Sequence, residues 1–146
     1  MISKKLYYFL SFTWGLPLTL VGCIVALVLL CLGYRPEKFC YCWHFKVGKN
    51  WGGLELGIIF ITDDTPTLHI KCHEFGHGLQ NCYWGFLMPF VICIPSAVRY
   101  WWREIVVLMG TPASLLPSYD SIWFEGDATR RGTEVYRLLN REKNNG

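Results

Sequence analysis

Two histidines and a glutamate stand at a spacing that suits metal chemistry. His73, Glu74 and His77 form the pattern H-E-x-x-H. On a helix, residues four apart lie one above the other, so both imidazoles can reach one metal ion while Glu74 lies beside it. In zinc hydrolases with this pattern the metal activates a water molecule and the glutamate accepts its proton. The pattern therefore predicts two zinc ligands and a catalytic base, and it requires a third ligand from elsewhere in the chain.

A later helix, predicted over residues 122–141, offers Glu125 as that third ligand. At steps of about 100° per residue, Glu125 falls on a face of small and apolar residues. A carboxylate on an inward face is costly unless it is paired or binds a metal. Asp127 instead has arginines three and four residues later, as on a solvated helix surface. The other residues on the inward face are Ala128, Gly132, Val135, Tyr136 and Leu139.

Three more polar residues are candidates for supporting roles. Gln80 follows His77 by three residues and can orient its imidazole, as metal-bound imidazoles usually require. Either His69 or Tyr119 can stabilise an oxyanion, although His69 also fits an interfacial histidine without a role in catalysis. His69 and His77 are about 12 Å apart along a regular helix, so they cannot bind the same ion.

The elements that must position these residues are a helix and a small hairpin. Thr65 and Pro66 predict the start of the histidine-bearing helix, with Thr65 as its cap. Residues 44–47 and 54–61 read as two strands joined by a glycine-rich turn. An exposed edge of such a hairpin can hold an extended peptide through main-chain hydrogen bonds, while a purely structural hairpin fits the sequence equally well.

These motifs resemble the gluzincin class of zinc metallopeptidases. In that class a glutamate from a later helix, often within E-x-x-A-D, completes the H-E-x-x-H site. Residues 125–128 match this second pattern, but Thr129 stands where aspartate is expected, so Asp120 or Asp127 must replace that carboxylate or it is absent. Residues 73–132 are also similar to small bacterial membrane proteins of unassigned function.

Two other metalloprotease classes fit less well. The metzincin pattern requires glycine and histidine where Gln80 and Tyr83 stand. Intramembrane metalloproteases carry the motif on a helix that is apolar throughout. Lys71, Gln80 and Asn81 argue against such deep burial.

The composition points to a membrane protein. Of 146 residues, 52% are hydrophobic and 17% are charged. Residues 16–34 predict a transmembrane helix, preceded by an interfacial segment. Because the apolar run continues past Cys23, a retained anchor is favoured over a cleaved lipoprotein signal. Residues 83–98 are too short and too broken by prolines for a second span, and they predict a re-entrant or interfacial segment.

Charge and cysteine content narrow the partners and the compartment. The net charge of +3 is dispersed, so we expect no nucleic acid partner. Seven cysteines, an odd number, imply no disulfide framework and favour a reducing, cytosol-facing location. The larger group of basic residues follows the predicted anchor, which also indicates a cytoplasmic catalytic region.

Together these features predict an α+β membrane protein. It would have an N-terminal transmembrane helix, a small β-hairpin and a helical H-E-x-x-H zincin-like core with a membrane-associated apolar segment. The expected units are an interfacial segment and anchor (1–36), a metallopeptidase domain (37–141) and a flexible tail (142–146). The expected function is zinc-dependent hydrolysis of a peptide or juxtamembrane protein segment at the bacterial cytoplasmic membrane, with the active site on the cytoplasmic side. The alternative is a non-catalytic membrane interaction protein with a structural zinc or no metal.

Overall fold

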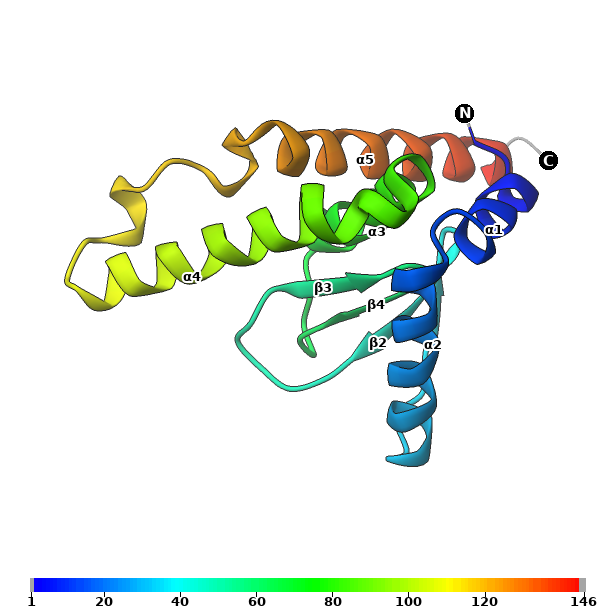
Figure 1. Ribbon diagram of the computed structural model, residues 1–146, viewed down its shortest axis with the longest axis horizontal. Helices are drawn as coiled ribbons and strands as arrows, with labels where there is room; N and C mark the ends of the chain where they lie inside the picture. Colours follow the sequence, from blue (N-terminus) through cyan, green and yellow to red (C-terminus); the bar gives the residue numbers. More distant parts are fainter. Residues whose placement is uncertain (1, 145–146) are drawn as a thin grey trace.

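The fold is built on a four-stranded mixed sheet with helices packed against it. The computed structural model describes residues 2–144, except for the side chain of Lys143. The strands are β1 (Glu37–Phe39), β2 (Cys42–Lys46), β3 (Gly53–Leu56) and β4 (Ile59–Thr62), in the spatial order β1-β2-β4-β3. The helices are α1 (Lys4–Phe12), α2 (Leu16–Cys31), α3 (Leu68–Trp84), α4 (Ile94–Leu108) and α5 (Trp123–Asn144). The predicted α+β class is confirmed, and α3 lies between the sheet and α5 (Figure 1).

The predicted hairpin, in which residues 44–47 would pair with residues 54–61 across the glycine-rich turn, is wrong. β2 pairs with β4 in parallel, whereas residues 54–61 turn back on themselves to form the antiparallel hairpin of β3 and β4. The turn depends on Gly57, whose φ of +78° is readily adopted by glycine. A Cβ there would also lie 2.4 Å from Oγ1 of Thr19. As a result β3 is an edge strand of the sheet.

The histidine-bearing helix begins slightly later than predicted. Thr67, rather than Thr65, is the N-cap of α3, and its hydroxyl accepts a hydrogen bond from the amide of Ile70 at 3.2 Å. Pro66 therefore precedes the cap instead of occupying the first helical turn. The shift leaves the whole H-E-x-x-H motif within the regular helix.

The last helix buries the face predicted from its sequence. Glu125 and Ala128 are fully buried in α5, and Val135 is 8% exposed. α5 continues to Asn144, three residues into the segment expected to be a flexible tail, and residues 145–146 lie outside the described part of the chain.

Glycines allow α3 and α5 to approach closely. A Cβ at Gly76 would lie 1.8 Å from the carbonyl oxygen of Ala128, and a Cβ at Gly132 would lie 1.8 Å from that of Cys72. The two contacts are reciprocal, because each glycine of one helix faces a main-chain carbonyl of the other. This crossing brings the backbones that carry the histidines and Glu125 together.

The apolar segments form helices that project from this core (Figure 1). α2 contains 16 residues and ends three residues before the predicted span does. No single helix among residues 2–144 combines the length and hydropathy needed to cross a bilayer. Two bent pairs reach these values only jointly: α1 with α2, at 93°, and Leu68–Leu87 with Pro89–Leu108, at 115°. α4 has no buried residue.

Candidate metal centre

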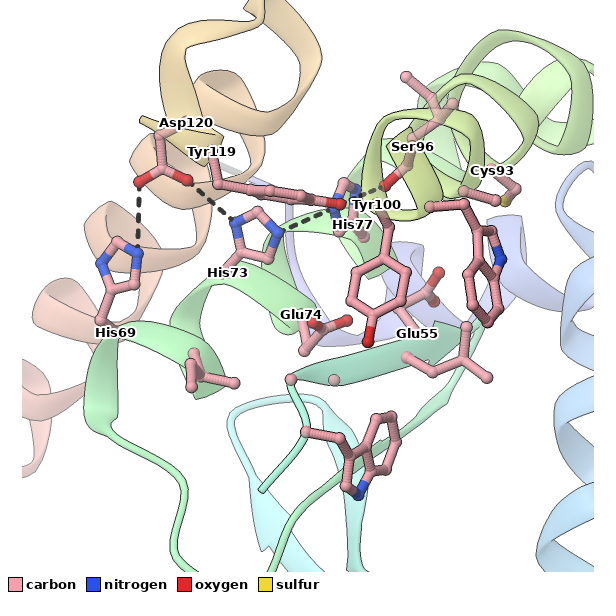
Figure 2. A pocket seen from close by; sticks show the side chains of 18 of the residues that line it. Glu55, His69, His73, Glu74, His77, Cys93, Ser96, Tyr100, Tyr119 and Asp120 are labelled. Carbon is pink, nitrogen blue, oxygen red and sulfur yellow. Dashed lines mark hydrogen bonds and ion pairs between the residues drawn. The ribbon is translucent and has the colours of Figure 1, made fainter. Parts of the chain in front are cut away.

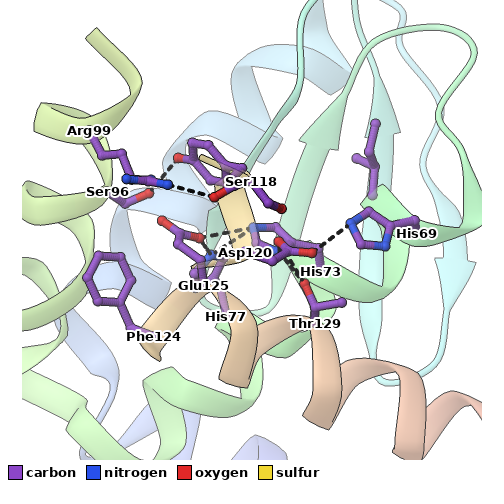
Figure 3. Close-up of polar contacts among 12 residues, drawn as sticks. His69, His73, His77, Ser96, Arg99, Ser118, Asp120, Phe124, Glu125 and Thr129 are labelled. Atoms are coloured by element: carbon purple, nitrogen blue, oxygen red, sulfur yellow. Dashed lines mark hydrogen bonds and ion pairs between the residues drawn. The ribbon is translucent and has the colours of Figure 1, made fainter. Parts of the chain in front are cut away.

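The structure brings together His73, His77 and Glu125. Nε2 of His73 and Nε2 of His77 lie 3.2 Å apart. They lie 3.2 and 3.1 Å, respectively, from Oε2 of Glu125. The two histidines come from neighbouring turns of α3, and Glu125 comes from the first turn of α5 (Figure 3). All three side chains are buried, so three metal-binding groups converge on one point.

The spacing and chemistry of these donors fit a metal ion. Donors that lie about 2.0–2.1 Å from one tetrahedral ion are about 3.3–3.4 Å apart, close to the separations between these atoms. The second carboxylate oxygen of Glu125, Oε1, is buried and has no hydrogen-bond partner in the described chain. An oxygen in this position can be satisfied by an additional metal contact. The group His73, His77 and Glu125 can therefore hold a metal ion.

A chain of hydrogen bonds supports His73 from the side away from the other ligands. Its Nδ1 lies 2.8 Å from Oγ1 of Thr129, and that hydroxyl donates to Oδ1 of Asp120 at 3.2 Å. Oδ2 of Asp120 in turn lies 3.3 Å from Nε2 of His69. The gluzincin pattern has an aspartate where Thr129 stands. Here the threonine hydroxyl links the imidazole of His73 to the carboxylate of Asp120.

His77 has a parallel arrangement. Its Nδ1 lies 2.8 Å from Oε1 of Gln80, as expected for a residue that orients the imidazole. The amide of Gln80 donates to Oδ2 of Asp127 at 3.2 Å. Asp127 also accepts hydrogen bonds from two arginines, so it is both part of the helix surface and the outer end of this chain. In each case a neutral side chain bridges the imidazole and an aspartate, and Nδ1 of His73 also lies 3.7 Å from Oδ1 of Asp120.

Each metal-binding side chain affects the pKa of its neighbours. Burial alone would lower the pKa of His77, but its hydrogen bond to Glu125 and the charges of Glu74 and Glu125 raise the pKa to about 9. Burial opposes ionisation of Glu125, but hydrogen bonds to His73 and His77 hold its pKa below the ordinary value. A metal ion that binds here must displace the proton held by His77.

Glu74 lies on the sheet side of the metal ligands, next to β3 (Figure 2). It is 6% exposed, and burial raises its pKa. A Cβ at Gly53 would lie 2.4 Å from Oε1 of Glu74. The carboxylate can occupy this position because residue 53 has no side chain. A base with a raised pKa beside a metal site can accept a proton near neutral pH.

The two oxyanion candidates lie differently. The hydroxyl of Tyr119 lies 3.1 Å from Oγ of Ser96, and its ring is 6.1 Å from that of His73. Tyr119 reaches across the cavity toward Ser96, whereas His69 pairs with Asp120 at its margin (Figure 2). The side chain of His69 is 58% exposed. Tyr119 is therefore better placed to donate a hydrogen bond inside the cavity.

The metal-binding group opens onto a cavity of about 730 Å³. Its walls come from β3, α3, α4 and the segment around Tyr119. They include both histidines and Glu74. Among residues 2–144, three side chains can donate to the same metal ion. Glu74 and the cavity lie beside them. Structural zinc sites are usually closed by four protein ligands, whereas catalytic sites keep a position open. The three donors and the adjacent cavity leave space in which a further ligand could bind a metal ion.

Sequence reasoning missed Gly53, Glu55 and Ser96. Glu55 could have been singled out from the sequence, because it is the one charged residue in the apolar run 54–61. As for Glu125, a carboxylate among apolar residues is costly unless it is paired or binds a ligand. Gly53 and Ser96 carried none, since their roles depend on contacts between distant segments. No protein-family model, curated protein sequence or solved structure matches this chain.

Proposed function

We propose that the chain is a membrane-anchored zinc metallopeptidase of the gluzincin type that cuts peptide bonds near the membrane surface. The observation that carries this proposal is the convergence of two imidazoles and a carboxylate at a cavity that also contains Glu74. Two nitrogen donors and one oxygen donor form a set typical of catalytic zinc. Bound zinc would polarise the scissile carbonyl and lower the pKa of the attacking water.

The protein groups have separate tasks in this proposal. Glu74 accepts the proton of the attacking water and passes it to the leaving amine. Tyr119, held by Ser96, donates a hydrogen bond to the oxygen that becomes negative as the carbonyl is attacked. Gln80 and Thr129 hold the two imidazoles in the orientation needed for binding the metal.

Strand β3 supports a peptide as the substrate. It is an edge strand, and three of its four residues, Gly53, Leu54 and Glu55, line the cavity. An extended peptide can pair with the free edge through main-chain hydrogen bonds. Its side-chain specificity would then come from contacts with the cavity. Pairing along β3 would carry the peptide past Glu74, because Gly53 lies directly against that carboxylate.

The proposed location rests on the exposed apolar helices. Leu20, Ile24 and Leu27 of α2 are 55–63% exposed, and Val98 and Leu108 of α4 are 64% and 83% exposed. Apolar surface of this extent is covered by lipid or by another protein. We propose that a bilayer, the bacterial cytoplasmic membrane, covers it, with the basic residues after α2 and the active site on the cytoplasmic side. The substrate is then a peptide or a juxtamembrane segment.

The test combines metal analysis with proteolysis by the purified full chain in detergent. We expect one zinc per chain and chelator-sensitive cleavage of membrane-anchored candidate substrates. Glu74→Gln should retain zinc and lose cleavage by about 10²-fold or more, as for loss of a general base. Glu104→Gln, at an exposed position on α4, controls for removal of a negative charge.

Two results would contradict the proposal. If Glu74→Gln cleaves as well as the wild type, the cleavage does not come from this site. Stoichiometric zinc without cleavage of any substrate would favour the alternative, a membrane interaction protein with a structural zinc.

A further inference from the structure

Glu55 is a buried carboxylate that the proposed reaction does not use. It lies in β3, is 6% exposed and lines the cavity. Neither of its carboxylate oxygens has a side-chain hydrogen-bond partner in the described chain. Burial raises the pKa of Glu55 to about 8, against the opposing effect of His77. An unpartnered carboxylate inside a protein lowers stability, and a ligand that supplies a partner removes that cost.

The rest of the cavity indicates the charge of such a ligand. Among the described residues, its lining contains Glu55, Glu74 and Asp120 together with three histidines, and no lysine or arginine. The lining also contains aromatic rings from Trp51, Tyr100 and Trp101, which can pack against an alkyl stem or the face of a cation. Acidic groups together with aromatic walls suit the side chain of lysine or arginine.

The position of Glu55 relates it to the proposed peptide-binding edge. Residues two apart on a strand point to the same face, so the side chain of Glu55 lies on the face from which Gly53 meets Glu74. The two positions are about 7 Å apart along the strand. Figure 2 shows Glu55 and Glu74 on the same side of β3. An extended peptide paired with β3 covers the distance between the two positions in two residues, so Glu55 would meet a side chain near the scissile bond.

A second metal ion is a poorer occupant. The only group of three metal-binding side chains found within residues 2–144 is His73, His77 and Glu125, and Glu55 is not part of it. A monovalent organic cation needs one carboxylate, which Glu55 supplies. The facing wall comes from α4, which has no buried residue.

We propose that Glu55 makes the cavity selective for substrates with a lysine or arginine side chain within two residues of the scissile bond. This inference rests on the proposed peptidase function. Glu55 acts by binding the substrate side chain and takes no part in the proton transfers assigned to Glu74.

The experiment uses peptides and matched peptide hydroxamates, which bind zinc and need not be cleaved. Members of each series differ only in having lysine, norleucine or glutamate at one of the two positions next to the reactive group, and each position is varied in turn. The zinc-loaded full chain is compared with Glu55→Gln, Glu55→Lys and Glu104→Gln, using kcat/KM for the peptides and Kd for the hydroxamates. Circular dichroism verifies that each variant is folded.

We expect the wild type to prefer lysine over norleucine by at least about tenfold, the usual scale for a charge-assisted hydrogen bond. Glu55→Gln should bring this ratio close to one, Glu55→Lys should favour glutamate, and Glu104→Gln should keep the wild-type ratio. Equal treatment of lysine and norleucine by the wild type overturns the subsite while leaving the peptidase proposal intact. Lysine selectivity among hydroxamates, without peptide cleavage, supports the subsite and counts against the peptidase. If no hydroxamate binds, both proposals fail.

Discussion

Replacing Gly132 with alanine should separate the two halves of the metal centre. The new Cβ would lie 1.8 Å from the carbonyl oxygen of Cys72, and real Cβ contacts essentially never fall below 3.0 Å. The obstacle is main chain rather than a flexible side chain, so α3 and α5 must move apart by about 1.2 Å. Metal–ligand distances tolerate about 0.2 Å. Glu125 can then no longer share an ion with His73 and His77.

The expected effect on metal binding is larger than the effect on folding. Overpacking costs about 1–3 kcal/mol, and alanine recovers up to about 1 kcal/mol of helix propensity relative to glycine. Loss of zinc affinity should be at least about 100-fold, since disturbing only the groups that orient a ligand already costs 10–100-fold.

The assay for Gly132→Ala is zinc competition against a chromogenic chelator, with circular dichroism to verify helix content. Glu134→Ala, at an exposed site on the same helix, is the matched control and should bind zinc like the wild type. Zinc binding by folded Gly132→Ala at wild-type affinity would refute the argument that this glycine sets the spacing of the ligands.

Three further changes test the surroundings of the metal ligands. Gly53→Ala should displace the Glu74 carboxylate, which lies 2.4 Å from the new Cβ, and lower kcat by about tenfold or more while the zinc content measured on the same sample is unchanged. Thr129→Val should weaken zinc binding about 10–100-fold in calorimetry, whereas Thr129→Asp should restore it, because it again gives His73 a hydrogen-bond acceptor. The pKa of Glu55 is raised from 4.5 to about 8 in the folded state, so the folded chain binds more protons than the unfolded chain between these values and its stability should fall as pH rises. At about 1.4 kcal/mol per pH unit, the free energy of unfolding should fall by at most about 5 kcal/mol over this pH range. Denaturation of the metal-free chain at several pH values should show this fall for the wild type and not for Glu55→Gln.

The two helices that carry the metal donors could be predicted from local sequence because their signals are periodic. The inward face of α5 follows from residue spacing alone, and the structure buries Glu125, Ala128 and Val135 as predicted. The motif on α3 likewise needs only four-residue spacing to bring two imidazoles together. Neither inference required knowledge of how distant segments pack.

The sheet could not be read in the same way. Residues 54–61 contain enough apolar and β-branched side chains to resemble one long strand, and only the positive φ at Gly57 shows that the chain reverses there. The parallel pairing of β2 with β4 is a contact between segments that are not consecutive strands, so no turn sequence encodes it. The place of Gly53 against Glu74 depends on that pairing and was unpredictable for the same reason.

The cavity and the exposed apolar surface are connected through α4. Ser96, Ala97, Tyr100 and Trp101 of this helix line the cavity, while Val98 and Leu108 of the same helix are largely exposed. Whatever covers α4 therefore lies beside the metal-binding group. If lipid covers it, a substrate that reaches β3 must approach along the membrane surface, which favours a juxtamembrane segment over a loop of a soluble folded protein. The membrane proposal and the substrate proposal thus depend on one helix, and charged substitutions on the exposed face of α4 should weaken liposome binding and cleavage of membrane-anchored substrates together.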